Sequence, residues 1–185
     1  VNRNSTQGKR VILWPDTFNN FFYPDILQSG LNVLHKLGFE VSVPQGNFCC
    51  GRPLYDFGFL AEATQQLAQI LEGFRSEIEA GTSFLVLEPS CYAVFKDEML
   101  NLMPENELAQ KLARQTFLLA EFLSKEPLKP SPAPWKEKIY LHGHCHQKAL
   151  GGTGADLKLL KSLDLDAELL QAGCCGMAGA FGYSG

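Results

Sequence analysis

The six cysteines are the residues of this chain whose type and spacing could do chemistry. They are Cys49, Cys50, Cys91, Cys145, Cys174 and Cys175. Both adjacent pairs are followed by glycine, and adjacent cysteines join each other only through a strained small ring. Thiolates are ligands of soft metals and of iron–sulfur clusters. We therefore expect the set to bind metal rather than to form a disulfide scaffold.

Every cysteine, Cys174 and Cys175 after the predicted strand at 167–170 included, is expected at the carboxyl end of a strand or at the start of a helix. Cys49 and Cys50 follow a predicted strand at 39–43, Cys91 follows one at 84–87, and Cys145 follows one at 138–142. Ligand sites of open α/β sheets gather at this edge. Helix N-termini lower thiol pKa values, so we expect thiolates to be favoured here. Any single cysteine could instead be a small core residue, but the repeated placement favours ligation.

Histidines surround one of these cysteines. His144 and His146 flank Cys145 within the segment 142–148. Imidazole can ligate zinc or iron, or hydrogen-bond to a ligating sulfur. A loop histidine whose nitrogens bond to backbone carbonyls is the alternative. Direct thiol attack by Cys145 is a further hypothesis. It lacks a recognisable third orienting group, and the sequence has no Cys-x-x-Cys motif.

The elements that must position these residues occur twice. In the first half, a strand at 9–14, a helix from Pro24 to Gly38 and the strand at 39–43 precede the first Cys-Cys-Gly. In the second half, the strand at 138–142, a helix at 156–165 and a strand at 167–170 precede the other Cys-Cys-Gly. This predicts an α/β fold of two Rossmann-like βαβ repeats with parallel sheets, related by internal duplication.

Further elements lie between the two repeats. The patterns predict helices at 60–78, 92–102 and 105–123 and the buried strand at 84–87. Four prolines then crowd into a short stretch. We expect residues 1–125 to form the first repeat with additional helices, 126–137 a Pro-rich linker, and 138–185 the second repeat, truncated at its C-terminus.

The composition excludes several classes of partner. The formal net charge is −4, which argues against nucleic acid and anionic membrane surfaces because both require a basic face. No apolar run approaches the roughly 20 residues of a membrane helix, so we expect no transmembrane segment. The N-terminus has no apolar signal region and no Met. We expect a piece of a longer cytoplasmic protein, peripheral at the membrane through partner subunits.

Four segments resemble the cysteine-rich CCG domain family. They are Phe48–Asp56, Glu88–Tyr92, His142–Lys148 and Gly173–Tyr183. The family includes the cysteine-rich subunit of heterodisulfide reductase and the iron–sulfur subunit of glycolate oxidase. The segments look most similar to the C-terminal part of FAD-linked 2-hydroxy-acid oxidases, and the similarity spans nearly the whole chain.

This resemblance implies an electron-transfer domain of iron–sulfur type, such as 4Fe-4S, within a flavin-dependent oxidoreductase for glycolate- or D-lactate-like acids. Cys49, Cys50 and Cys91 would serve one half, with the other three cysteines serving the second. The implied partners are flavin-binding and ferredoxin-like domains or subunits, with FAD on another domain. The fragment alone would carry no catalytic residue.

The sequence departs from the family pattern in the first half. Asp16 is the nearest candidate where the counterpart of Cys145 is expected, and Glu88 replaces the first cysteine of a Cys-x-x-Cys pair. A carboxylate is a harder ligand than a thiolate. Three thiolates per half cannot complete a four-cysteine site, so a centre needs another ligand or ligands pooled from both halves. Zinc binding in the fragment, or a metal-free docking module, is the alternative.

Overall fold

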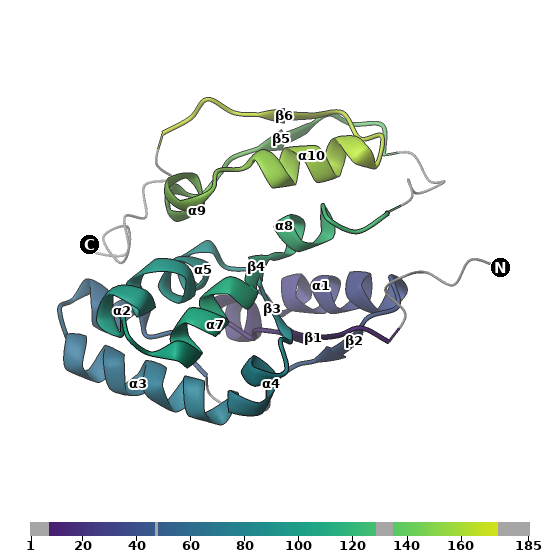
Figure 1. The fold of residues 1–185 in the computed structure, drawn as a ribbon. Coiled ribbons are helices and arrows are strands. Elements are labelled where there is room, and N and C mark those ends of the chain that lie inside the picture. The colour runs from purple at the N-terminus through teal and green to yellow at the C-terminus, as the bar shows by residue number, and fades with distance from the viewer. Residues whose placement is uncertain (1–7, 47, 129–134, 174–185) are drawn as a thin grey trace. The chain divides into compact units, whose positions relative to one another are not determined.

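The computed structural model describes residues 8–46, 48–128 and 135–173. The chain forms two compact units, Val1–Leu119 and Ala120–Gly185 (Figure 1). The division falls ahead of the Pro-rich stretch, and the domain limits inferred from the sequence stay predictions. No helix among the described residues has the length and apolar character needed to cross a membrane.

The described part of unit 1 contains a four-stranded parallel sheet. Its strands are β1 (Arg10–Leu13), β2 (Glu40–Ser42), β3 (Ser83–Val86) and β4 (Thr116–Leu118), in the order β2-β1-β3-β4. Val11 lies opposite Val41 on one side and Ser83 on the other. From β1 the chain adds β2 on one side of the sheet and then β3 and β4 on the other, so the direction in which strands are added reverses between β1 and β3. Ligands of open α/β sheets bind at such a point, outside the carboxyl ends of the strands.

Helical segments connect these strands. They are η1 (Phe18–Phe22), α1 (Pro24–Lys36), α2 (Arg52–Asp56), α3 (Leu60–Gly73), α4 (Arg75–Glu79), α5 (Pro89–Ala93), η2 (Val94–Glu98), α6 (Met99–Leu102) and α7 (Glu107–Gln115). The predicted helix from Pro24 is confirmed. It ends ahead of Gly38, whose φ of +88° suits the left-handed turn after a helix.

Side chains alternate across the sheet. Ile12, Trp14, Phe84 and Val86 belong to the main core cluster, which includes residues of α3, α4 and α7. Trp14 is fully buried and meets Phe74 and Phe95 edge-to-face.

Val11, Leu13 and Leu85 are also buried, but they point to the other face. On that side Gly30 of α1 lies so close to the chain after β3 that an added Cβ would be 3.3 Å from Leu87 Cδ1. Both faces of the sheet are therefore covered, as parallel sheets require.

The helices predicted after residue 60 need correction. A single helix over 105–123 is wrong, because α7 ends at Gln115 and β4 follows before α8 (Leu119–Leu123). Pairing of β4 with β3 overrides the local helical pattern, and the Thr116 hydroxyl bonds to Leu112 O.

The predicted helix at 60–78 divides into α3 and α4 at Phe74, whose ring packs on Trp14 and Phe84. The predicted helix at 92–102 starts earlier, at Pro89, and passes through π-helical η2 before α6. Packing of bulky side chains against the sheet decides where these helices begin and end. The periodicity of the sequence alone does not show these helix ends.

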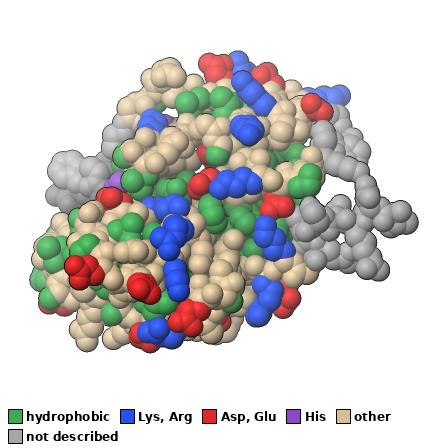
Figure 2. Space-filling view, in the orientation of Figure 1, with side chains coloured by type: hydrophobic (Ala, Val, Ile, Leu, Met, Phe, Trp, Pro, Cys, Tyr) green, Lys and Arg blue, Asp and Glu red, His purple; other side chains and the backbone are tan. Residues whose placement is uncertain are grey.

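Unit 2 contains the second βαβ arrangement. β5 (Ile139–Leu141) and β6 (Ala167–Leu169) pair in parallel, and α9 (Cys145–Leu150) and α10 (Gly154–Ser162) lie between them in the chain. The α/β class with parallel strands is confirmed in both halves. Helix α9 was not predicted from the sequence. Charges of both signs lie next to one another on the face drawn in Figure 2, as expected for a chain with a small net charge.

Candidate metal centre

The three thiols of unit 1 come together at the carboxyl edge of the sheet. Cys49 and Cys50 lie in the loop that joins β2 to α2, and Cys91 is the third residue of α5, just after β3. Cys50 is 2% exposed and Cys91 is 8% exposed, while Cys49 is half-buried. The Cys50 thiol shares hydrogen bonds with both Cys49 and Cys91. The structure thus brings together the cysteines predicted for the first half, and their role as ligands stays a prediction.

Hydrogen-bond donors surround the Cys49–Cys50 loop. Gly51, with φ +84°, turns the chain into α2, and backbone hydrogen bonding from Gly51 and Arg52 acts to lower the pKa of the Cys49 and Cys50 thiols, respectively. From α3, Gln66 Nε2 donates to Cys49 O at 2.6 Å. The loop is therefore held from both α2 and α3. Hydrogen bonds to sulfur are among the factors that set the potential of an iron–sulfur group.

The expectation that these thiols favour the thiolate is wrong for unit 1. The hydrogen bond with Cys50, followed by burial, raises the pKa of Cys49. For Cys50, the hydrogen bond with Cys49 lowers the thiol pKa. The hydrogen bond with Cys91 and burial raise it by more, so the pKa of Cys50 lies well above its ordinary value.

Cys91 behaves in the same way. Its bond with Cys50 lowers the thiol pKa, yet burial and the nearby Glu88 and Asp16 carboxylates raise it overall. The short α5 helix does not overcome these effects. A bound cation would reverse them, because a coordinated thiol loses its proton.

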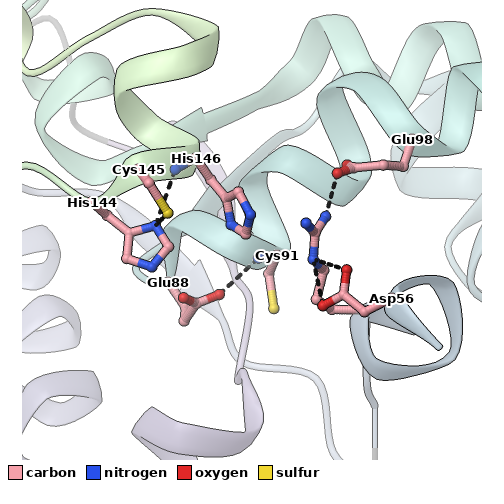
Figure 3. A network of polar contacts seen from close by, with 8 residues as sticks. Asp56, Glu88, Cys91, Glu98, His144, Cys145 and His146 are labelled. Atoms are coloured by element: carbon pink, nitrogen blue, oxygen red, sulfur yellow. Dashed lines mark hydrogen bonds and ion pairs between the residues drawn. The ribbon is translucent and has the colours of Figure 1, made fainter. Parts of the chain in front are cut away.

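The two carboxylates predicted as substitute ligands lie at the ends of β1 and β3. Asp16 is 1% exposed and accepts hydrogen bonds from Asn19 N at 3.0 Å and Asn19 Nδ2 at 2.7 Å. Burial is the main cause that raises the pKa of Asp16. Glu88 Oε2 accepts the Cys91 backbone N–H at 2.7 Å and so caps α5 (Figure 3). Both carboxylates close local turns, and metal ligation by them stays a prediction.

An ion-pair network borders the cysteine loop. Arg52 bonds to Asp56, with Nε 3.1 Å from Oδ1, and pairs with Glu98 of η2 (Figure 3). The Arg52 and Glu98 side chains are 16% and 11% exposed. This network ties the start of α2 to η2. Sequence reasoning missed it, although Arg52 and Asp56 carry the i,i+4 spacing of a helical ion pair.

In unit 2, His144, Cys145 and His146 place their ligand atoms within 4.8 Å of one another. Cys145 is exposed, and its Sγ lies 4.0 Å from His144 Nδ1. His144 also caps α9, because its Nδ1 accepts the His146 backbone N–H at 3.3 Å. The predicted grouping of these residues around Cys145 is therefore present (Figure 3).

The residues just before Cys174 contact the segment around Cys145. His142 Nε2 lies 3.0 Å from Gly173 O, and Lys148 Nζ donates to Ala172 O at 2.9 Å. Cys174 and Cys175 lie outside the described residues.

Comparison with known proteins identifies the family. The model of a cysteine-rich domain named CCG matches residues 16–96. Lactate utilization protein A of Halalkalibacterium halodurans is 30% identical over 181 residues, covering 93% of this chain and 72% of the relative. The chain belongs to the cysteine-rich CCG domain family. Proteins of the same name from Geobacillus kaustophilus and Bacillus subtilis are 30% and 28% identical, and each match covers 93% of this chain and 74% of the relative.

The residues present in this CCG domain fit a thiolate-bound metal or iron–sulfur group. The three thiols influence one another's pKa, and nearby backbone N–H groups act to lower the pKa of two of them. Within the described residues, the buried Trp14 Nε1 has no hydrogen-bond partner, and Trp14 belongs to the same core cluster as Cys50 and Cys91. Such an unsatisfied donor is costly unless a further acceptor is provided. The matched span starts at Asp16 and includes Cys49, Cys50 and Cys91.

Proposed function

We propose that this chain is an electron-transfer module of iron–sulfur type that serves the oxidation of a 2-hydroxy acid of the lactate or glycolate class. Its centres are held by Cys49, Cys50 and Cys91 in unit 1 and by Cys145, Cys174 and Cys175 in the second half. The observation that carries this proposal is the convergence of three thiols where the strand order reverses. The name shared by the relatives, lactate utilization protein A, supports the substrate class.

The residues of unit 1 have distinct tasks in this role. An iron–sulfur group, when bound, takes up and passes on single electrons. The three thiols would hold it, and the N–H groups of Gly51 and Arg52 would stabilise negative charge on the sulfurs. Burial of Cys50 and Cys91 limits water around the ligands. Solvent exposure and hydrogen bonds to sulfur both tune the potential of such a group.

The module works with other redox components in this proposal. Flavin-binding and ferredoxin-like domains or subunits of the same oxidoreductase supply and receive the electrons, and FAD lies on one of them. The resemblance to the C-terminal part of FAD-linked oxidases supports this arrangement. The assembly would act in the cytoplasm, with partner subunits placing it at the membrane surface.

Anaerobic reconstitution of the full chain with iron and sulfide tests the proposal. We expect charge-transfer absorption in the visible range and an EPR signal in one oxidation state. Cys50→Ser, which keeps the size of a buried ligand, should lose the unit 1 signal while the far-UV circular dichroism stays unchanged. A reconstituted wild-type chain without an EPR signal in either the oxidised or the reduced form would contradict the proposal.

A divalent-metal site is the second candidate function, and the grouping of His144, Cys145 and His146 favours it. Zinc accepts nitrogen and sulfur ligands in a tetrahedral arrangement, so these residues would supply three of four positions. The module would then dock redox partners without passing electrons. Elemental analysis of the purified chain separates the candidates, since stoichiometric zinc without iron favours docking.

A further inference from the structure

Gln66 is the side chain outside the cysteine set that is most closely tied to the Cys49–Cys50 loop. It lies on α3, 17 residues along the chain from Cys49, and its Nε2 donates to Cys49 O at 2.6 Å. The same side chain also acts to lower the pKa of the Cys49 thiol through hydrogen bonding. One residue of a separate helix therefore holds the backbone of a predicted ligand and acts on its thiol.

The loop backbone leaves room for this contact. A Cβ built on Gly51 would lie 3.8 Å from Gln66 Nε2 and 4.0 Å from Ala63 Cα, so α3 packs directly over the Cys-Cys-Gly turn. Ala63 and Gln66 are three residues apart and share one helix face. The adjacent Leu67 and Ile70 are buried in the core, which fixes the rotation of α3 and the direction of the Gln66 side chain.

The geometry points to Gln66 as a positioning residue of the unit 1 centre, which holds Cys49 in the orientation for ligation and donates a hydrogen bond toward its sulfur. This inference rests on the proposal that Cys49, Cys50 and Cys91 bind a metal or an iron–sulfur group. An amide NH₂ has two donor hydrogens, so it can serve the carbonyl and the sulfur together. Loss of a partner that orients a metal ligand typically weakens metal binding about 10- to 100-fold.

The test uses Co²⁺ as the probe in the full chain carrying Cys145→Ser, Cys174→Ser and Cys175→Ser. In this background the thiolate-to-cobalt absorption reports on unit 1. Gln66→Leu removes the donor, and Gln66→Glu keeps the shape of the side chain without the NH₂ group. Gln69→Leu is the matched control, because Gln69 is exposed on the same helix. We expect both Gln66 variants to bind Co²⁺ at least about tenfold more weakly, with Gln69→Leu unchanged.

A second measurement separates positioning from general stability. In the reconstituted chain, loss of a donor to sulfur should make the reduction potential of the unit 1 centre more negative. Unchanged Co²⁺ affinity and potential in both Gln66 variants would overturn the inference, even if their thermal stability falls. Absence of any thiolate-to-cobalt absorption in the parent chain would instead overturn the proposed centre and the role of Gln66 together.

Discussion

At the scale of single residues, Glu88 has a contact that is independent of any metal. Its carboxylate caps α5 by accepting the backbone N–H of Cys91. We expect Glu88→Ala to lower the free energy of unfolding by about 1 kcal/mol, the usual effect of losing an N-cap. Glu88→Gln keeps an acceptor oxygen and should lower it by less. Urea unfolding of both variants measures the difference.

The same two variants test whether Glu88 ligates a metal. An amide is a poor replacement for a ligating carboxylate, so Glu88→Gln should lower the metal content if Glu88 is a ligand. Metal content equal to that of the wild type would leave Glu88 with a capping role only.

Gly51 is the residue whose backbone conformation decides the path of the cysteine loop. Its φ of +84° lies in the left-handed region, and an added Cβ would make only ordinary contacts of 3.8 Å and 4.0 Å. Gly51→Ala should therefore cost about 1–2 kcal/mol through backbone strain alone. Gly73→Ala is the matched control, because a Cβ there meets nothing within 4 Å. Thermal unfolding that shows equal stability of the two variants would refute the strain argument.

The sequence could predict which cysteines meet, but not what surrounds them. Cysteines that follow parallel strands of one sheet share its carboxyl edge, so the grouping of Cys50 after β2 and Cys91 after β3 follows from the element order, although β1 lies between these two strands. The contacts of Gln66 with Cys49 and of Arg52 with Glu98 join residues 17 and 46 positions apart. They depend on how helices rotate and pack, and no local pattern records that. The raised thiol pKa values follow from hydrogen bonds between the thiols and from burial, and both depend on the packed unit.

At the scale of elements, a hydrogen bond joins helices α9 and α10 of unit 2. Gln147 Nε2 of α9 donates to Asp156 Oδ2 of α10 at 2.5 Å. Burial raises the pKa of Asp156 above its ordinary value of 3.8, although its own backbone N–H and Gln147 act in the opposite direction. A carboxyl group whose pKa is raised on folding binds its proton more tightly in the folded state. Its contribution to stability is therefore complete below pH 3.8 and is lost as the pH rises through the folded value.

Asp156→Asn isolates this contribution. The variant keeps an acceptor oxygen for Gln147 and removes the charge, so its stability relative to the wild type should be greater at pH 7 than at pH 3. Chemical denaturation of both proteins between pH 3 and pH 7 measures the difference. A stability difference that is independent of pH would show that Asp156 does not titrate with a raised pKa.

Element prediction succeeded where the hydrophobic pattern and the packing agree. β1, β3 and α1 carry strong local patterns and lie where the sequence indicated. The prediction was wrong at β4. Residues Thr116–Leu118 continue a helical sequence pattern, and they form a strand only because they pair with β3. Helix α9 is short and follows a glycine, so its local pattern was too weak to predict.

At the scale of the whole molecule, the two units have unequal cores. Unit 1 has a large apolar cluster that includes Trp14, Phe84 and Phe95. Among the described residues of unit 2, the buried hydrophobic side chains are Phe122, Leu123 and Ala167. Because apolar burial is the main stabilising contribution in folding, the two units should differ in stability although they share the βαβ plan.

Hydrogen exchange on the full chain tests this difference. We expect the amides of β1 and β3 to exchange slowest, because both strands are central and almost fully buried. The amides of β5 and β6 should exchange through an opening of lower free energy, with a smaller dependence on denaturant, since less surface becomes exposed. Equal free energies and equal denaturant dependence in the two sheets would mean that the units unfold as one cooperative structure. In that case the cysteines of unit 2 would be held as firmly as those of unit 1.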